Sequence, residues 1–401
     1  MLNFLAAEKD RLPSGEPDNF SGGKRIGLML DLSVIEKPTL VLDESRARRN
    51  LERMAAKARQ HGVSFRPHFK THQSAEMGGW FRDEGVIAIT VSSVDMAAYF
   101  AQAGWEDILI AFTANPRQIS AIDELAGKIH LELLVESAET AAFFQQHLTH
   151  TVDVWIKVDV GNHRTGIRVD DHAQILSLAR QISQGSRLRF RGLLTHAGQT
   201  YHTTSTGQIL EIYHQAVTAM IETKKALAAG GFAQAELSYG DTPSCTLAEN
   251  FNGLSEIRPG NFIFYDVMQY HLQVCAEEDI AVAVACPVVA KHTVPGPDWT
   301  DHRLVLYGGA VHLSKEYISS GGRDIYGGLA YLDAAGWGPI LPQAFVFSLS
   351  QEHGLARVTP EQFERMHIGD LLVVLPVHSC LTVDLFCEYV TLDGRCLRIK
   401  R

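Results

Sequence analysis

The chain has 401 residues, of which 46% are hydrophobic and 20% charged, and its formal net charge at pH 7 is −10. That length and apolar content predict a folded protein with two or more domains. The acidic balance, without any basic run, argues against nucleic acid as a partner. No signal-peptide core and no run of about eighteen apolar residues occur, so we expect a cytoplasmic protein that does not bind membranes.

The cysteines all lie in the later part of the chain, and none forms a C-x-x-C pair. They are Cys245, Cys275, Cys286, Cys380, Cys387 and Cys396. This spacing is typical neither of a disulfide framework nor of a closed structural zinc site. A metal site in this chain would therefore need a mixed set of ligands.

From Thr39 onward, short β-branched runs alternate with amphipathic helical segments. The expected strands are TLVLD, VSFRPHF, VIAITV, DILIAF, HLELLV, VDVWIKVD, LRFRGLLTH and ELSYG. Eight strands in roughly 220 residues match a TIM-type (β/α)8 barrel in count and length, whereas a doubly wound sheet usually stops at about six. We therefore predict an α/β fold with this barrel over residues 37–275.

After about residue 276 the pattern changes to strands without long helices, separated by Gly, Pro and Asp. These strands are IAVAVACPVVAKHTV, RLVLYGG, DLLVVLP and EYVTLDG. They predict a separate, mainly β domain over residues 276–401. Residues 1–36 are too few to fold alone, and we expect them to pack against that β domain.

Lys70 lies at the C-terminal end of an expected strand, VSFRPHFKTH. Alternation places its side chain on the same face as those of Arg66 and His68. Catalytic residues gather at this edge of a barrel, and two cationic neighbours can lower the pKa of a lysine enough for Schiff-base chemistry. A solvated lysine at a strand end is the other interpretation, and for an isolated lysine it is the commoner one.

The segment YGDTPS follows a late barrel strand, where this architecture often binds phosphate. Backbone N–H groups near Gly240 can approach a phosphate closely, and Thr242 and Ser244 add hydroxyl donors. Gly260 and Asn261, in the next loop, are expected to complete the site. An ordinary β-turn would use the same residues.

His378 and Cys380 lie one residue apart in VVLPVHSCLTV, which alternates like a strand and predicts that both side chains share a face. Imidazole plus thiolate favours zinc, and two protein ligands leave positions for water and substrate. An isolated H-x-C more often packs in a core. Manganese is the second metal that we consider.

RPHFKTHQ, after KPTLVLD and a helical segment ending KARQHGV, resembles the cofactor-lysine segment of the fold-type III enzymes that use pyridoxal 5′-phosphate (PLP). The resemblance is to the D-serine dehydratase and D-threonine aldolase branch, which is related to alanine racemase. Further similar segments follow in order: VDVGNHRTG, GLLTHAGQTYH, LSYGDTPSC, SEIRPGNFIFYD, QEHG and PVHSCLTVDL. Seven segments in order, several at the ends of expected strands, make coincidence improbable.

This resemblance implies that Lys70 carries PLP and that His68 lies beside the cofactor. It implies that Arg164 contacts the phenolic oxygen of PLP, and that His196 and Tyr201 lie against the ring and face the substrate. His202 is the expected base near the metal. A solvated loop arginine and packed strand-end histidines are the other interpretations of these residues.

One segment departs from the family pattern. Where the family has an Asp-Ala-Gly-Ser-Lys type of sequence, this chain has YGGAVHLSKE, with Tyr307 in place of the acid and an added His312. The segment from Tyr307 to Glu316 is expected to border the active site. It leaves open which D-amino acid fits.

The resemblance implies a D-amino acid lyase that forms a homodimer. We expect dehydration of a β-hydroxy-D-amino acid such as D-serine, because the zinc-dependent dehydratases carry Cys where the aldolases carry Asp, and this chain has Cys380. Retro-aldol cleavage with release of glycine is the first alternative. Racemisation would leave the H-x-C unexplained, and a non-catalytic PLP-binding protein would need only the barrel.

Overall fold

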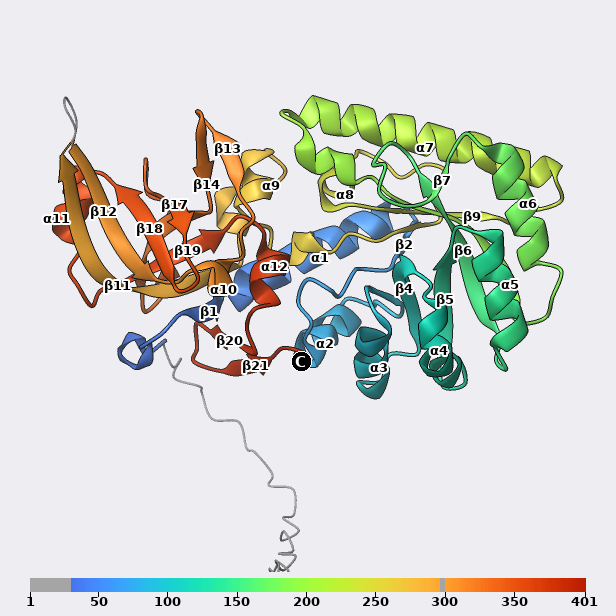
Figure 1. Cartoon of the computed structure of the whole chain (residues 1–401), viewed down its shortest axis with the longest axis horizontal. Helices are drawn as coiled ribbons and strands as arrows, with labels where there is room; N and C mark the ends of the chain where they lie inside the picture. The colour runs from blue at the N-terminus through green and yellow to red at the C-terminus, as the bar shows by residue number, and fades with distance from the viewer. Residues whose placement is uncertain (1–29, 296–299) are drawn as a thin grey trace, which may run out of the picture.

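The computed structural model describes residues 30–295 and 300–401 and shows two lobes (Figure 1). One lobe is a parallel barrel wrapped by helices, and the other is an antiparallel β domain. The long helix α1 (Glu44–Gln60) runs from the β domain to the barrel. The two lobes follow one another along the longest axis of the molecule.

Eight parallel strands form the barrel, in the order β2-β10-β9-β8-β6-β5-β4-β3. Their bounds are β2 (Ser64–Phe65), β3 (Ile89–Val91), β4 (Asp107–Thr113), β5 (His130–Val135), β6 (Val152–Asp159), β8 (Leu188–His196), β9 (Glu236–Gly240) and β10 (Glu256–Ile257). The two ends of this order meet where His68 bridges Thr90, and the Phe69 N–H donates to the Thr90 carbonyl at 2.8 Å. A short strand, β7 (Ile167–Arg168), pairs with β6. The predicted barrel is confirmed.

The barrel helices begin where side chains can cap them. Asp43, Ser93, Ser137, Asp171 and Ser205 each accept a hydrogen bond from the N–H three residues later, which satisfies a donor that the helix itself leaves free. After α1 the helices are α2 (Ala75–Asp83), α3 (Val94–Gln102), α4 (Ile119–Ala126), α5 (Ala138–His147), α6 (His172–Ile182), α7 (Thr206–Ala229) and α8 (Thr242–Leu247). Their apolar faces pack on the strands to form one continuous core.

The first expected strand, TLVL, does not belong to the barrel. It forms β1 (Thr39–Leu42), which pairs antiparallel with β11 (Val282–Pro295) and parallel with β20 (Glu388–Thr391). The prediction that this strand opens the barrel is therefore wrong. The eighth barrel strand is instead β10, which is only two residues long. Strand β1 belongs to the sheet of the β domain, whose other strands all come from the C-terminal part of the chain.

The β domain is a ring of strands in the order β11-β12-β18-β17-β15-β19, closed because β11 pairs with both β12 and β19. The other strand bounds are β12 (Thr300–Tyr307), β13 (Ile318–Ser320), β14 (Arg323–Ile325), β15 (Gly327–Asp333), β16 (Gly336–Trp337), β17 (Phe345–Leu349), β18 (His353–Val358), β19 (Leu371–Pro376) and β21 (Cys396–Arg398). The short helices are α9 (Val267–His271), α10 (Ala310–Leu313), α11 (Pro360–Arg365) and α12 (Ser379–Val383). The predicted mainly β C-terminal domain is confirmed.

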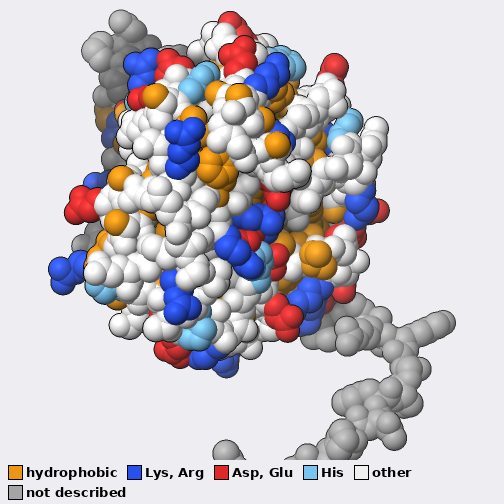
Figure 2. Space-filling view, turned by 90° about the vertical axis from the view of Figure 1, so that its right-hand side faces the viewer, with side chains coloured by type: hydrophobic (Ala, Val, Ile, Leu, Met, Phe, Trp, Pro, Cys, Tyr) orange, Lys and Arg blue, Asp and Glu red, His pale blue; other side chains and the backbone are white. Residues whose placement is uncertain are grey.

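Of the predicted N-terminal segment, residues 1–29 lie outside the described part. Leu30 and Ile35 are buried in a cluster with Ala283 of β11 and Val373 of β19. No helix among the described residues is long and apolar enough to cross a membrane. On the barrel face shown in Figure 2, side chains of both charge signs are interspersed.

His130 stands at the N-terminal end of the barrel between two carboxylates. Its ring nitrogens lie 3.2 Å from Asp107 and 2.9 Å from Asp153, and these hydrogen bonds outweigh partial burial and raise the pKa of His130 to about 10. A histidine whose folded pKa exceeds its unfolded value of about 6.5 stabilises the fold fully below about pH 6.5, and this contribution declines as pH rises toward 10.

We therefore expect His130→Gln to lower the free energy of unfolding more at pH 6 than at pH 9. Because His130 is about one-third exposed, the difference should be only about 1 kcal/mol. Urea unfolding of both proteins at the two pH values measures it. An equal loss at both would show that the charge of His130 contributes nothing.

Candidate active site

Lys70 stands at the C-terminal mouth of the barrel. The preceding residue, Phe69, is fully buried against Phe81, Phe100 and Trp105. This aromatic anchor fixes the backbone, while Lys70 itself is exposed. The predicted position of Lys70, on the face where barrel enzymes place their chemistry, is therefore found in the structure.

Arg66 is not the cationic neighbour of Lys70 that strand alternation predicts. Its guanidinium is buried and paired with Asp107, Glu132 and Glu256 at 2.6, 3.0 and 2.9 Å. The positive charge of Arg66 is neutralised by these carboxylates at the N-terminal end of the barrel. It therefore does not activate Lys70. His68 does lie close: its Nδ1 accepts a hydrogen bond from the Lys70 N–H at 3.3 Å.

His68 and His196 are both held neutral. Burial lowers the pKa of each well below its usual range, and the positive charge of Lys70 lowers it further. His196, at the end of β8, donates its Nδ1 proton to the Gly240 carbonyl at 2.9 Å, which leaves Nε2 with a free lone pair. Neutral rings beside a lysine suit the packing of an aromatic cofactor.

Tyr201 and Arg164 approach the mouth from two loops. The hydroxyl of Tyr201 accepts the N–H of Thr242 at 3.2 Å, and burial raises the pKa of this phenol above its usual value. Arg164, in the loop after β6, is exposed, and its charge contributes to lowering the pKa of His196. The structure thus brings His196, Tyr201 and Arg164 together with Lys70.

The YGDTPS segment forms the end of β9 and the start of α8, and not a free β-turn. Asp241 caps the helix by accepting the Ser244 N–H at 2.7 Å. The Ser244 hydroxyl accepts from Tyr239 at 3.0 Å, whereas the buried Thr242 hydroxyl has no partner among the described residues. A buried hydroxyl without a partner costs free energy, so Thr242 fits an anionic ligand such as phosphate.

Gly260 and Asn261 follow β10, and Gly260 touches the Lys70 segment. A Cβ at Gly260 would lie 3.0 Å from the Cβ and carbonyl oxygen of His68 and from the Thr71 hydroxyl, so a side chain there would crowd this approach. Asn261 donates to Asp266 at 2.7 Å and to Ser379 at 2.9 Å. Asn261 therefore connects the barrel to α12 of the β domain.

His378 and Cys380 do not share a strand face. Strand β19 ends at Pro376, and His378 is the residue immediately before α12, so the predicted strand alternation is wrong here. The first turn of the helix nevertheless brings the two side chains close enough for each to shift the pKa of the other. Cys380 Sγ lies 3.2 Å from the Thr71 hydroxyl, one residue from Lys70.

His378 and Cys380 each favour the charged form of the other. Burial opposes both charges, but the neighbouring Cys380 thiol and Glu316 carboxylate raise the pKa of His378 to about 10, and the neighbouring imidazole lowers the pKa of the Cys380 thiol. The neighbouring His378 lowers the pKa of Glu316, and the charge of the exposed His202 lowers it further, although burial acts in the opposite direction. A thiolate beside an imidazole is a donor set that suits zinc.

Two buried charged residues near this site were missed by the sequence analysis. Lys157 on β6 donates to the Val158 carbonyl at 3.0 Å, and burial followed by the charges of Arg258 and Arg164 lowers its pKa to about 7. Arg258 is buried and donates to the Ser238 hydroxyl at 2.6 Å. The lysine in the largely apolar strand VDVWIKVDV was the sequence signal that could have indicated a buried charge.

A second set of possible metal ligands lies elsewhere. Asp107, His130 and Glu132 offer ligand atoms within 4.8 Å of one another, and they form the only such trio among the described residues. The Arg66 guanidinium already pairs with both carboxylates, and these residues belong to the opposite end of the barrel from Lys70. We therefore assign this trio to the barrel's ion-pair network and not to the active site.

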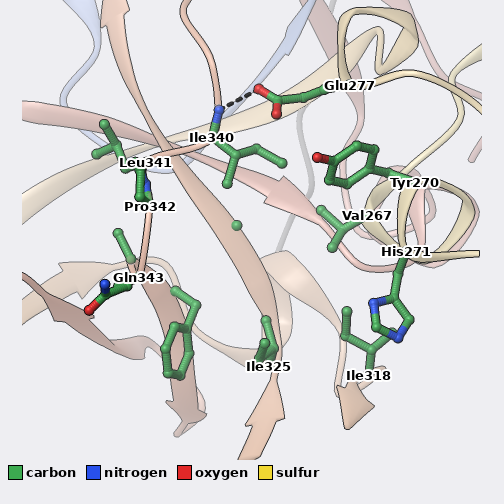
Figure 3. A pocket seen from close by; sticks show the side chains of 13 residues that line it. Val267, Tyr270, His271, Glu277, Ile318, Ile325, Ile340, Leu341, Pro342 and Gln343 are labelled. Atoms are coloured by element: carbon green, nitrogen blue, oxygen red, sulfur yellow. Dashed lines mark hydrogen bonds between the residues drawn. The ribbon is translucent and has the colours of Figure 1, made fainter. Parts of the chain in front are cut away.

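An apolar pocket of about 430 Å³ lies in the β domain (Figure 3). Val267, Tyr270 and His271 of α9 line one side of it, and Leu341, Pro342 and Gln343 line the opposite side. Its lining contains none of the residues predicted for catalysis, cofactor or metal. This pocket is therefore separate from the candidate site at the barrel mouth.

Two family matches divide the chain as the structure does. Residues 42–267 match "Alanine racemase, N-terminal domain", and residues 281–392 match "Putative serine dehydratase domain". The first match covers more than half of the chain, which shows the family. The resemblance to fold-type III enzymes is confirmed.

Curated relatives cover nearly the whole chain. D-threo-3-hydroxyaspartate dehydratase of Delftia sp. strain HT23 is 29% identical, over 90% of this chain and 96% of its own. D-serine dehydratase of Dictyostelium discoideum is 27% identical, over 91% and 95%. D-threonine aldolase of Arthrobacter sp. is also 27% identical, over 88% of each.

The solved structure of the Delftia dehydratase has a TM-score of 0.83 at 27% identity, covering 92% of this chain and 98% of that one. A cysteine-to-alanine mutant of that enzyme was solved in a metal-free form, also with a TM-score of 0.83. Fold, domain order and relatives agree. The chain belongs to the alanine racemase N-terminal domain family and also carries a serine dehydratase domain. It is a PLP-dependent lyase of D-amino acids.

Proposed function

We propose that this lyase dehydrates a β-hydroxy-D-amino acid, D-serine first among the candidates, to a 2-oxo acid and ammonia with the help of zinc. The observation that carries the proposal is the His378–Cys380 pair, in which Cys380 Sγ lies 3.2 Å from the hydroxyl of Thr71, the residue after Lys70. An exposed lysine can accept the α-proton of the substrate, and a metal held by a thiolate and an imidazole can assist loss of the β-hydroxyl. Such a site can therefore serve both steps of the elimination. The relatives named dehydratases support the same reaction.

When bound, PLP supplies an electron sink and the metal supplies a Lewis acid. Lys70 would hold the cofactor covalently and then accept the α-proton of the substrate. Thr242, Gly240 and Ser244 would receive the cofactor phosphate, since the Thr242 hydroxyl is buried without a partner in the described structure.

His196 and Tyr201 would pack against the ring, and Arg164 would donate to its phenolic oxygen. Gly260 lets the neighbouring loop approach His68, which would lie beside the cofactor. Asn261 stands nearer to Cys380, with its Nδ2 3.6 Å from Sγ, and its carbonyl oxygen has no partner among the described residues. We therefore propose that Asn261 serves the metal side of the site more than the phosphate side.

His378 and Cys380 would bind the metal. Deprotonated thiolate and neutral imidazole are the forms that coordinate, and a bound cation would replace the proton that the pair now shares. The soft thiolate favours zinc over manganese. The metal-free cysteine mutant of the Delftia dehydratase supports a metal role for a cysteine in this group of enzymes.

Retro-aldol cleavage is the competing reaction, because the D-threonine aldolase of Arthrobacter has the same 27% identity to this chain as the Dictyostelium D-serine dehydratase. In that reaction His202 would be the base. It is exposed, and it lies close enough to Glu316 to lower the pKa of that carboxyl. Cleavage would release glycine, which dehydration does not. The products therefore distinguish the two reactions.

We expect the purified enzyme to convert D-serine to pyruvate, to lose at least about 100-fold of this activity on chelation, and to regain it with Zn²⁺. D-Serine, D-threonine and 3-hydroxy-D-aspartate are assayed for both keto acid and glycine. The visible absorbance of bound PLP, monitored throughout, controls for loss of the cofactor. Full activity without metal would contradict the metal role, and glycine as the main product would replace dehydration by aldol cleavage.

We also propose that the enzyme is a homodimer. Large apolar side chains stay exposed next to the metal pair, on α10, on α12 and beside them: Val311, Tyr317, Leu381 and Leu385. A second copy covering them would enclose the site, as the family resemblance implies. The cytoplasmic location and the absence of nucleic-acid and membrane partners stay predictions.

A further inference from the structure

Glu316 ends the segment that departs from the family pattern, and the structure directs it at the metal pair. Between α10 and β13 the chain turns at Ser314, a non-glycine residue with φ of 65°, whose hydroxyl accepts the Glu316 N–H at 3.2 Å. Oε2 of Glu316 then lies 3.9 Å from Nδ1 of His378. Both side chains are partly exposed, so small rotations can close that distance.

The geometry argues against Glu316 as a direct ligand. Ligand atoms on one ion lie close together, yet among the described residues only Asp107, His130 and Glu132 offer three such atoms within 4.8 Å. As their side chains stand, Glu316, His378 and Cys380 do not offer three ligand atoms within that distance. The carboxylate faces a nitrogen of His378 without joining the thiolate.

A carboxylate in this position has a known physical effect on a metal-binding histidine. It accepts the proton of one ring nitrogen, which fixes the tautomer and the ring orientation and makes the other nitrogen a better donor. Here the carboxylate is at Nδ1, which leaves Nε2 as the nitrogen for a metal.

We propose that Glu316 is the positioning residue of the metal site: its carboxylate accepts the Nδ1 proton of His378 and so presents Nε2 to the ion. This inference rests on the proposed metal site at His378 and Cys380. It gives the atypical segment from Tyr307 to Glu316 a role in the same reaction, through the metal and not through the substrate.

The test is the Zn²⁺ affinity of the PLP-loaded enzyme, measured by competition with a chromophoric chelator. We expect Glu316→Ala to weaken Zn²⁺ binding by about 10- to 100-fold. Glu316→Gln should weaken it less, because the amide oxygen still accepts the Nδ1 proton. The PLP absorbance should stay unchanged in both variants, since Glu316 acts at the metal.

Asp370→Asn is the matched control, because Asp370 forms a similar carboxylate–imidazole pair with His367, at 3.4 Å, in the same domain. It should bind Zn²⁺ as the wild type does. Wild-type affinity in Glu316→Ala would overturn the inference, and so would an equal loss in Asp370→Asn, which would indicate general loosening of the domain.

His378→Ala separates this inference from the proposed function. If it leaves Zn²⁺ affinity unchanged, the metal site itself is wrong and the role of Glu316 falls with it. If it removes binding while Glu316→Ala binds normally, the metal site stands and only the role of Glu316 is wrong. Glu316→Gln, which preserves side-chain volume, gives the answer should the alanine variant fail to fold.

Discussion

Replacing Lys70 with alanine is expected to abolish covalent cofactor binding and to reduce turnover by at least about 10³-fold. The reason is the position of Lys70: an exposed amino group on a backbone anchored by Phe69, beside two neutral histidines and one residue from the Cys380 contact. Visible absorbance of the purified protein measures the cofactor, and keto-acid formation from D-serine measures turnover.

Two further lysine variants make this result specific. Lys128→Ala removes an exposed lysine that lies in the turn after α4 and pairs with Glu124, and it should leave absorbance and turnover unchanged. Lys157→Met removes the buried lysine of β6, whose amino group is held by the Val158 carbonyl. If Lys70→Ala kept the absorbance and Lys157→Met lost it, Lys157 would be the cofactor lysine and the present assignment would be wrong.

The barrel could be predicted because its strands and helices are encoded locally. Runs such as HLELLV and VDVWIKVD are apolar and β-branched, and capped amphipathic helices separate them. Strand membership could not be predicted in the same way. Thr39–Leu42 reads like any barrel strand, but its partners Val282 to Ala285 lie about 240 residues away, and only tertiary pairing decides between the sheets.

The candidate site was predictable wherever its residues occur in characteristic segments at strand ends. Lys70, His196 and Thr242 gather at one barrel mouth because the C-terminal ends of parallel strands share an edge. The H-x-C pair was found for a partly wrong reason, since a helix turn and not a strand brings His378 and Cys380 together. The role of Glu316 depends on a contact between separate loops, which no local pattern reveals.

The partners of buried charged residues could not be predicted from the sequence. A charged residue in a strand is normally taken to face solvent, but Arg66 points into the barrel, where its partner Glu256 lies 190 positions away. Such a pair is invisible in either strand alone. The same holds for Arg258, whose partners are the Ser238 hydroxyl and the Thr195 carbonyl.

This hidden network leads to the largest expected effect on stability. Arg66→Met would leave the buried carboxylates of Glu132 and Glu256 without their shared cation. Breaking a buried ion pair in this way typically costs about 3–5 kcal/mol, so we expect a loss of that size in the free energy of unfolding at pH 8. Urea unfolding measures it, with Arg168→Met as control: Arg168 pairs with Asp170 on the surface, and its loss should cost less than about 1 kcal/mol.

The pH dependence identifies the cause. Burial already raises the pKa of Glu132 above its ordinary value although Arg66 opposes this, and removing Arg66 would raise it further. A carboxyl whose folded pKa is raised binds its proton more readily in the folded state, so the deficit of Arg66→Met should shrink as pH falls from 8 to 5.5. Adding Glu132→Gln should recover part of the loss at pH 8, because a neutral amide needs no cation. A deficit that ignores both pH and the second substitution would mean that Arg66 stabilises the barrel by packing alone.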